Sequence, residues 1–446
     1  MNKLALSQIN LVLNGQLINK DAEFNFVSTD SRTLKPGQLF IALVGPNFDG
    51  HQFLEAVKNK GAAAAIVSKA VKVDLPLLQV VDTHKALGEL AAWHRKQLQL
   101  PIVALTGSCG KTTVKEMIHS ILAECGSTLA SEGTLNNDIG VPLSLLKLQP
   151  EHQYAVIEMG ANHLGEIAYL THLTQPTVAL INNIAPAHLA GFGSVEGVAQ
   201  AKAEIFAGLD KAGVALINAD DPFAAWLKQK LVDKKIITFG IDNTADFQAH
   251  SLNASQEGHF SFVLTTKDGE IVIRLPLLGR HNVLNAAAAA AASYAVGASL
   301  SAIKTGLEKM QPVNGRLVMR QGQAGARVFD DTYNANPFSV RAALQVLANY
   351  KGERVFVLGD MGELGDSAEQ HHSDIGLLAK QLGINKLYAW GKLSQVAAKA
   401  FGEGAYYFED KTKLSDAVRG VLNADVTVLV KGSRSAKMEQ VVAALL

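Results

Sequence analysis

The sequence predicts an α/β protein built from three domains, which span residues 1–83, 84–312 and 313–446. In the second segment, short apolar stretches alternate with helix-forming stretches, a pattern typical of a parallel sheet covered by helices. The alternation starts again in the third segment and predicts another, doubly wound sheet. The first segment is shorter and mixes both patterns, so it predicts a small α/β domain with a modest core. The chain length of 446 residues fits about three domains.

Composition and charge exclude several classes of protein. The 41 Lys and Arg residues balance the 41 Asp and Glu residues, and no basic run stands out that would attract nucleic acid or an anionic membrane. The two cysteines cannot form a disulfide framework, and the N-terminal segment lacks the features of a signal peptide. No apolar run approaches the roughly 20 residues of a membrane-spanning helix. We therefore expect a cytoplasmic monomer without membrane insertion that acts on small molecules.

The most informative stretch is ALTGSCGKTTVKE, which begins at Ala104. It follows an apolar run that predicts a buried strand, and it leads into a helix-forming segment. A glycine loop at such a junction points successive backbone N–H groups and the helix N-terminus at one anion. Lys111 would then reach the terminal phosphates of a nucleotide, and the Thr112 hydroxyl would hold a magnesium ion. The sequence therefore predicts a P-loop and a central domain of the ATPase type.

The loop departs from the usual P-loop pattern at one position. Leu105 stands where that pattern has its first glycine, so the loop is a shorter variant. The nucleotide-binding residues expected from this stretch are Gly107, Ser108, Cys109, Gly110, Lys111, Thr112 and Thr113. The Cys109 thiol, at a helix start beside a lysine, is expected to react more readily than that of Cys125. A small residue that the loop merely tolerates is the simpler alternative.

Polar side chains follow the predicted strands of the second domain. We expect these strands at IVALTG, YAVIEMG, TVALINN, VALIN and IITFG. Ligands of parallel sheets gather at the carboxyl ends of the strands. Glu158 ends the second of these strands and His188 follows the third, so both would reach the edge that carries Thr112 and could complete an octahedral magnesium site with phosphate oxygens. The alternatives are a capping or ion-paired carboxylate and a buried structural histidine.

Further polar residues of this domain exceed what local structure requires. Asn136 and Asn137 precede a predicted helix, where a single cap would be enough. His281, Asn282 and Asn285 stand at the polar start of an alanine-rich helix and offer donors and acceptors that suit a purine edge.

Two other segments of the domain have simple explanations. Residues from about 247 to 279 alternate as short strands and predict an added β-hairpin region that turns at Lys267-Asp268-Gly269. Lys202 lies among small residues in a predicted helix, and on these grounds alone a solvated lysine is the simplest interpretation.

Dense polar loops also occur in the two outer domains. In the first domain they contain Ser31-Arg32 and Asp49-Gly50-His51, and ordinary turn chemistry would explain either one. The third domain has a Rossmann-like pattern whose strand ends carry polar clusters. These clusters contain Asp330-Asp331 with Asn334 and Asn336, Gly359-Asp360-Met361-Gly362-Glu363, and Lys431-Gly432-Ser433-Arg434. Each could be a helix cap, but three clusters at one rim indicate a substrate site that faces the second domain.

Taken together, these stretches resemble the Mur ligases, a family of ATP-dependent amino-acid ligases of peptidoglycan synthesis. The resemblance covers the whole chain and rests on STDSR, FDGH, TGSCGKTT, NNDIGVP, EMGAN, NIAPAHL, AKAEIF, GRHNVLNAAAA, DDTYNANP, GDMGELG and VKGSRS, in this order. Several stretches are similar to the members that join D-alanyl-D-alanine to UDP-N-acetylmuramoyl-tripeptide through an acyl phosphate, which yields the UDP-muramoyl-pentapeptide. The resemblance implies that the first domain holds the UDP part of the substrate, the second ATP, and the third the acceptor dipeptide and part of ATP.

The resemblance also implies roles for single residues. The UDP-substrate would contact Ser31, Arg32, Asp49, Gly50, His51, Asn136 and Asn137. Besides the loop, the ATP contacts would be His281, Asn282, Arg316 and Asp331. Two magnesium ions would be held by Thr112, Glu158, His188 and Lys202. The acceptor dipeptide or the growing peptide would contact Asn334, Asn336, Lys431 and Arg434.

The interpretation of Lys202 changes most with this resemblance. It matches a lysine that is carbamylated in related ligases, and the resulting anion would help to hold the second magnesium ion. Together with Lys111 and His188, it makes up the catalytic set that the resemblance implies.

Two other functions agree with part of the pattern. Folylpolyglutamate synthetase resembles the ATP-binding and third domains, but it would not explain the UDP-type loops of the first domain. A P-loop ATPase that uses hydrolysis for motion would not explain the polar rim of the third domain. The sequence leaves open whether the third residue of the peptide substrate is diaminopimelate or lysine, because that choice depends on the shape of a pocket.

Overall fold

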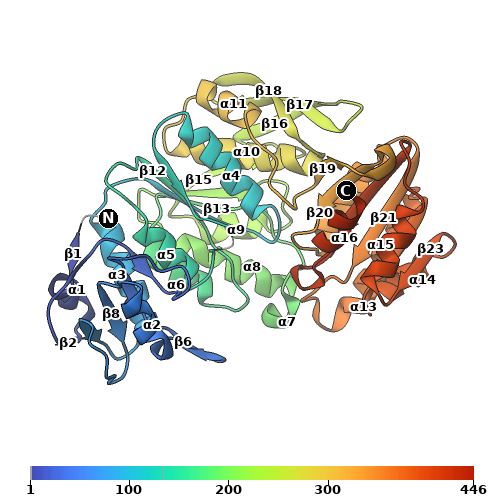
Figure 1. Ribbon diagram of the computed structural model, residues 1–446. Helices are drawn as coiled ribbons and strands as arrows, with labels where there is room; N and C mark the ends of the chain where they lie inside the picture. The colour runs from blue at the N-terminus through green and yellow to red at the C-terminus, as the bar shows by residue number, and fades with distance from the viewer. Residues whose placement is uncertain (1–2, 134) are drawn as a thin grey trace.

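The computed structural model describes residues 3–133 and 135–446 and has an α/β architecture (Figure 1). Its described part contains sheets of five, nine and six strands, which follow one another along the chain, and two short two-stranded pairs. In Figure 1 the blue N-terminal unit and the red C-terminal unit lie on opposite sides of the central unit. The predicted fold class is thereby confirmed. None of the described helices is long and apolar enough to cross a membrane.

The N-terminal unit is organised around the five-stranded sheet. Its strands lie in the order β2 (Gln16–Ile18), β9 (Leu77–Gln79), β8 (Ala64–Val67), β5 (Leu39–Ile41) and β4 (Val27–Ser28). The sheet is parallel apart from β2, which pairs antiparallel to β9. Around it lie α1 (Leu6–Leu13), η1 (Gly50–Phe53), α2 (Leu54–Asn59), the pair of β1 (Leu4–Ala5) with β3 (Glu23–Phe24), and the pair of β6 (Val44–Gly45) with β7 (Phe48–Asp49).

Helix α1 is missing from the sequence prediction. Its buried residues Leu6, Ile9 and Leu13 follow helical spacing and face the core. The N-cap residue before the helix is Ala5, whose side chain makes no capping hydrogen bond, so the usual start signal of a Ser, Thr, Asp or Asn is lacking. Burial of one apolar face therefore defines this helix more than its end signals do.

The central unit contains the nine-stranded sheet. Its order is β11 (Thr128–Ala130), β12 (Tyr154–Glu158), β10 (Ile102–Thr106), β13 (Val178–Ile181), β14 (Val214–Asn218), β15 (Lys235–Gly240), β16 (Phe247–Ala254), β17 (His259–Thr266) and β18 (Gly269–Leu278). Pairing is parallel from β11 to β16 and antiparallel from β16 to β18. The five predicted strands and the predicted hairpin are confirmed. Strand β11 was not predicted, because three half-buried residues do not form an apolar run.

Helices cover both faces of the central sheet. They are α3 (Thr83–Lys96), α4 (Lys111–Ala123), α5 (Gly140–Leu146), α6 (Glu166–Thr174), α7 (Leu189–Phe192), α8 (Val195–Ala203), η2 (Glu204–Gly208), α9 (Ala224–Lys230), α10 (Arg280–Ala295) and α11 (Leu300–Glu308). One hydrophobic cluster extends from the N-terminal sheet through α3 to one face, and a second holds α4, α10 and α11 on the other. The alanines from Ala286 to Ala292 are fully buried, and their small side chains let α10 pack closely on α4.

The C-terminal unit contains the six-stranded sheet. Its order is β19 (Val318–Gln321), β20 (Arg327–Asp331), β24 (Val426–Lys431), β21 (Glu353–Gly359), β22 (Lys386–Trp390) and β23 (Ala405–Phe408). Only β19 runs antiparallel to its neighbour among these described strands, and this edge strand was not predicted. The helical elements are η3 (Gln323–Gly325), α12 (Pro337–Ala348), η4 (Gly365–Ser367), α13 (Ala368–Gln381), α14 (Ser394–Phe401), α15 (Lys411–Arg419), η5 (Arg434–Ala436) and α16 (Glu439–Leu445). The predicted second winding is confirmed.

Candidate active site between the central and C-terminal sheets

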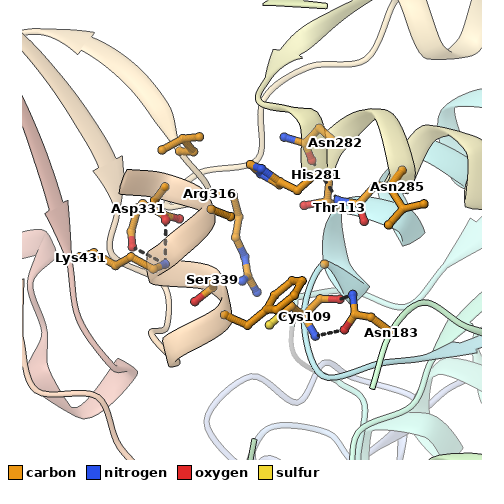
Figure 2. Close-up of a pocket in the computed structure, with 16 residues that line it drawn as sticks. Cys109, Thr113, Asn183, His281, Asn282, Asn285, Arg316, Asp331, Ser339 and Lys431 are labelled. Carbon is orange, nitrogen blue, oxygen red and sulfur yellow. Dashed lines mark hydrogen bonds and ion pairs between the residues drawn. The ribbon is translucent and has the colours of Figure 1, made fainter. Parts of the chain in front are cut away.

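The site lies where the carboxyl ends of the two larger sheets face each other, and it consists of two adjoining pockets. The first, here called the loop pocket, is lined by residues that follow β10, β12 and β13 and by residues that follow β20 and β21. The second, the α10 pocket, lies between the start of α10, the helix α12 and the glycine loop (Figure 2). Cys109, Gly110, Arg316 and Ser339 line both pockets. The sheet topology thus brings segments far apart in the sequence to one place.

The structure divides the predicted site residues into three groups. The loop pocket is lined by Ser108, Cys109, Gly110, Lys111, Thr112, Asn136, Asn137, Glu158, His188, Lys202, Arg316, Asn334 and Asn336. The α10 pocket is lined by Cys109, Gly110, Thr113, His281, Asn282, Arg316, Asp331 and Lys431. Neither lining includes Ser31, Arg32, Asp49, Gly50, His51, Gly107 or Arg434. Asn136 and Asn137, which were grouped with the N-terminal loops, therefore lie with the residues of the glycine loop.

The predicted residues of the N-terminal unit have partners within that unit. His51 is buried, with its Nδ1 atom 2.6 Å from Asp49 Oδ1, and its Nε2 atom accepts the Ser68 N–H at 2.9 Å. Arg32 is exposed and lies 2.8 Å from Asp30 in an ion pair. His51 therefore fixes the Asp49 turn against the end of β8, and contact of these residues with UDP stays a prediction.

The glycine loop joins β10 to α4 and requires glycine at Gly110. Its φ of 78° lies in the left-handed region, which glycine adopts without strain. A Cβ atom there would approach Asn182 Nδ2 to 2.7 Å and Asn285 Oδ1 to 2.8 Å. Lys111 Nζ donates to the Gly107 carbonyl at 2.8 Å, and its burial lowers the pKa of the amine. The loop and its lysine form a compact unit at the base of the pocket.

A series of asparagine side chains connects this loop with the start of α10. Asn182 Nδ2 donates to the Cys109 carbonyl at 3.0 Å and to Asn285 Oδ1 at 2.9 Å. Asn285 Nδ2 in turn donates to Asn282 Oδ1 at 2.9 Å, and Asn282 Nδ2 donates to the Leu278 carbonyl at 2.8 Å. Both ends of the Asn282 amide are engaged within the protein, and its contact with adenine stays a prediction. The geometry of the loop is thereby coupled to that of α10.

Asn183 holds the loop from a second direction. Its Oδ1 atom accepts the Cys109 N–H at 2.8 Å, and its Nδ2 atom donates to the Cys109 carbonyl at 3.0 Å, as the dashed lines in Figure 2 show. Asn183 ends the predicted strand TVALINN, but no specific role was expected for it. Its position directly after β13 was the available signal, since side chains at that strand end reach the loop.

Glu158 and Lys202 form part of the wall of the loop pocket. Glu158 Oε1 accepts a hydrogen bond from Asn136 Nδ2 at 2.9 Å, whereas Oε2 is buried without a hydrogen-bond partner among the described residues. An unpaired buried carboxylate oxygen is costly, so this atom suits a cation or donor that a ligand brings. Lys202 is 2% exposed, and burial, followed by repulsion from Lys111, lowers its pKa to about 7. A large fraction of its amine is therefore neutral near pH 7.

The side chains fit a magnesium ion when ligand oxygens complete its shell. The described residues contain no group of three or more His, Cys, Asp or Glu side chains that could hold a metal by themselves. The Thr112 hydroxyl, the Glu158 carboxylate and His188 do line one pocket. Magnesium prefers oxygen ligands and usually retains water or phosphate oxygens. A bound nucleotide would therefore have to supply part of the coordination.

Two residues of the C-terminal unit, Arg316 and Asn336, contact the glycine loop and the start of α4. Arg316 Nη2 donates to the Thr112 hydroxyl at 3.3 Å, and the guanidinium lies 3.9 Å from the centre of the Tyr333 ring. Asn336 Nδ2, at the N-cap of α12, lies 3.1 Å from Cys109 Sγ. These contacts place positive charge and polar groups of the C-terminal unit directly over the loop.

The other predicted residues of the C-terminal unit differ in their environment. Lys431 is buried, and its Nζ atom donates to Asp331 Oδ2 at 2.6 Å and to the Asn334 carbonyl at 2.9 Å. Figure 2 shows the Lys431–Asp331 pair on the side of the α10 pocket that faces His281. Arg434 is exposed and pairs with Glu439 at 3.2 Å. Lys431 thus orders the segment after β20, whereas Arg434 lies on the surface.

His188 contacts Glu363, which was expected in a polar cluster of the third domain but without a specific role. Its Nδ1 atom lies 2.7 Å from Glu363 Oε2, and this close contact is the main cause that lowers the pKa of Glu363. His188 comes from the central unit and Glu363 from the loop after β21, so the pair crosses the interface between the two units. The signal for Glu363 was its place at the carboxyl end of a predicted strand.

Models of Mur ligase domains match most of the chain. The model described as "Mur ligase family, catalytic domain" matches residues 23–95. "Mur ligase middle domain" matches residues 105–293, and "Mur ligase, glutamate ligase domain" matches residues 315–434. The three matches follow one another along the chain.

Similar proteins and structures extend over the whole length. The UDP-N-acetylmuramoyl-tripeptide--D-alanyl-D-alanine ligase of Escherichia coli K12 is 49% identical and covers 100% of this chain and 99% of its own. A crystal structure of MurF from Acinetobacter baumannii has a TM-score of 0.95 and 39% identity and covers 99% of this chain and 98% of its own. Thermotoga maritima MurF ligase in complex with ADP has a TM-score of 0.84 and 26% identity, covering 94% and 96%. The chain therefore belongs to the Mur ligase family.

Proposed function

We propose that the chain is an ATP-dependent amide ligase that joins D-alanyl-D-alanine to UDP-N-acetylmuramoyl-tripeptide. The main support is the 49% identity, over the whole length, to the Escherichia coli protein that carries this name. The ADP in the similar Thermotoga maritima structure supports ATP as the nucleotide. In this proposal, residues 1–83 hold the UDP part of the substrate, residues 84–312 bind ATP, and residues 313–446 bind the acceptor and complete the ATP site.

The reaction needs ATP because a carboxylate oxygen is a poor leaving group. Transfer of the γ-phosphoryl group to the tripeptide carboxylate forms an acyl phosphate and releases ADP. The free amine of the dipeptide then attacks the acyl carbon, and the tetrahedral intermediate collapses to the amide and inorganic phosphate. Water would hydrolyse the acyl phosphate, so a pocket enclosed by two units favours transfer to the amine.

At the phosphate end, catalysis consists mainly of positioning and charge neutralisation. In our proposal Lys111 exchanges its contact with the Gly107 carbonyl for an oxygen of the terminal phosphate. Arg316 reaches the same place from the C-terminal unit, since it already contacts Thr112. Magnesium, held by Thr112, Glu158 and His188, would supply further positive charge at the phosphoryl oxygens.

At the base end, the α10 pocket suits a flat heterocycle. Leu317, Phe338 and Ala342 line it from the C-terminal unit and offer apolar contact. Desolvation, with a smaller contribution from Lys431, lowers the pKa of His281 to about 4, so the imidazole is neutral near pH 7. A neutral imidazole offers one donor and one acceptor to a purine edge. We propose that His281, Asn282 and Asp331 contact the nucleoside.

Lys202 has the properties that carbamylation requires. Its pKa of about 7 leaves neutral amine available to react with carbon dioxide, which yields a carbamate anion and a proton. The anion would lie in the same pocket as Lys111 and Glu158 and would add oxygen donors for a second magnesium ion. Asn334 and Asn336, in the opposite wall, are our candidates for acceptor contacts.

The proposed reaction predicts strict dependence on both substrates. Inorganic phosphate should be released from ATP only when UDP-N-acetylmuramoyl-tripeptide and D-alanyl-D-alanine are both present, because each is consumed in the same turnover. A coupled phosphate assay with diaminopimelate-containing and lysine-containing tripeptides measures this. Release of phosphate at the same rate without either substrate would instead indicate an ATPase.

Replacement of Lys202 should remove activity in a way that a small anion can restore. We expect Lys202→Ala to lower kcat by about a hundredfold or more, the effect of losing one electrostatic group at a reacting phosphoryl. Added acetate should restore part of kcat in the variant and leave the wild type unchanged. Wild-type activity should fall in buffer without carbon dioxide and recover on addition of bicarbonate. Full activity of Lys202→Ala would contradict this role.

Substitution of Gly110 should weaken ATP binding specifically. In Gly110→Ala the new methyl group would collide with Asn182 and Asn285, so we expect KM for ATP to rise about tenfold or more, with a smaller effect on KM for the UDP-tripeptide. Gly165→Ala is the matched control, because Gly165 is also the N-cap of a helix, with φ of 89° and ψ of −20° close to the 78° and −1° of Gly110, but has open space around it. Steady-state kinetics of both variants separate the collision from the backbone strain. Equal KM values for ATP in the two variants would refute the steric argument.

A further inference from the structure

Glu363 forms part of the C-terminal wall of the loop pocket, opposite the glycine loop. It follows β21, and its carboxylate lies 2.7 Å from His188 Nδ1 of the central unit. Its side chain is 59% exposed, so the carboxylate remains accessible from the pocket in spite of this contact.

The loop that carries Glu363 is held at several points. The Asp360 carboxylate accepts hydrogen bonds from the N–H of Ser394 at 2.7 Å and from its hydroxyl at 2.8 Å. The N–H of Ser433 donates to the Asp360 carbonyl at 2.9 Å, and the N–H of Met361 donates to His372 Nε2 at 3.0 Å. The carboxylate that follows is therefore presented by an ordered segment.

Glu363 itself has a backbone conformation that is unfavourable for its residue type. Its φ of 62° lies in the left-handed region, where a residue with a Cβ atom is strained. Glycine adopts this conformation without strain, and the same loop already contains glycines at Gly362 and Gly365. A glutamate at this position is therefore better explained by its carboxylate than by the turn.

The other carboxylates of the loop pocket are already engaged or belong to the opposite wall. The carboxylates that line it are Glu158, Glu166 and Glu363. Glu158 lies with the glycine loop and accepts from Asn136. Glu166 accepts the Asn162 N–H at 2.7 Å and pairs with His163 at 3.1 Å. Among the described residues that line this pocket, Glu363 is thus the carboxylate that the C-terminal unit contributes.

We propose that Glu363 binds the ammonium group of the acceptor dipeptide. This inference rests on the proposed function, in which the C-terminal unit holds the acceptor while the central unit activates the carboxylate. The acceptor enters as an ammonium ion, and a carboxylate in the wall opposite the phosphate loop attracts it and orients its nitrogen toward the acyl carbon. The ammonium ion releases a proton to solvent, and the free amine that remains makes the attack. The exposed Glu363 carboxylate has room for the ammonium ion as a second partner beside His188, so activation of the tripeptide carboxylate does not depend on the acceptor.

Kinetic analysis of Glu363→Gln tests the assignment, because glutamine keeps the size of the side chain and removes its charge. KM for D-alanyl-D-alanine should rise about tenfold or more, as loss of a charge-assisted hydrogen bond implies, while KM for ATP and for the UDP-tripeptide should stay within about twofold. Glu363→Asp keeps the charge and should give an intermediate KM. Asp366→Asn is the matched control, because Asp366 is an exposed carboxylate nearby that does not line the pocket, and its KM values should equal those of the wild type.

Hydroxylamine separates the binding of the acceptor from the activation of the carboxylate. It is uncharged near neutral pH and converts an acyl phosphate into a hydroxamate without an ammonium site. Glu363→Gln should form the hydroxamate from ATP and the UDP-tripeptide at the wild-type rate. If the variant loses hydroxamate formation as strongly as dipeptide ligation, or if its KM for the dipeptide is unchanged, the proposal is overturned. If the proposed function itself is wrong, the outcome is different from these two results. The wild type would then form neither the hydroxamate nor the pentapeptide.

Discussion

A triphosphate that gives up its terminal group needs positive charge and hydrogen-bond donors on more than one side, and this requirement organises the molecule. The glycine loop supplies one side, with Lys111 at its end. The other side comes from the C-terminal unit, where Arg316 contacts Thr112 at 3.3 Å and lies 3.9 Å from the Tyr333 ring. Two parallel sheets meet with their carboxyl ends facing because only that arrangement gathers both sets of residues in one place.

The same requirement explains why the two lysine amines of the pocket have lowered pKa values. Lys202 is buried and Lys111 is partly buried, and repulsion between the two amines adds to the cost of burial in lowering the pKa of Lys202 to about 7. A bound phosphate would stabilise the charge on Lys111, whereas carbamylation would turn Lys202 into an anion. Glu158 adds a carboxylate oxygen without a partner among the described residues. Without ligands, the pocket therefore contains two amines that repel each other and a carboxylate oxygen without a partner. Both are unfavourable, and bound substrates would relieve them.

The sequence predicts five parallel strands of the central sheet well, because buried parallel strands are continuous apolar runs, and it predicts the glycine loop from its place between strand and helix. It does not predict α1, whose N-cap residue is an alanine, or β19, which has no buried apolar run. Predicted site residues lie together in the structure when they are at or after the ends of neighbouring strands. Glu158 and His188 are examples, since both line the loop pocket. The role of Asn182 in holding the loop depends on contacts with residues far along the chain, such as Asn285, and no local pattern encodes them. For the same reason the pairing of Glu363 with His188 required the structure.

Transfer of oxygen from the substrate to phosphate tests the central claim, that this two-sided site activates a carboxylate. The UDP-tripeptide is labelled with ¹⁸O in the reacting carboxylate, and the inorganic phosphate formed during ligation is analysed by mass spectrometry. An acyl phosphate leaves one carboxylate oxygen on the phosphoryl group, so the account predicts one ¹⁸O atom in each phosphate released. Phosphate that contains no ¹⁸O while pentapeptide is formed would contradict it.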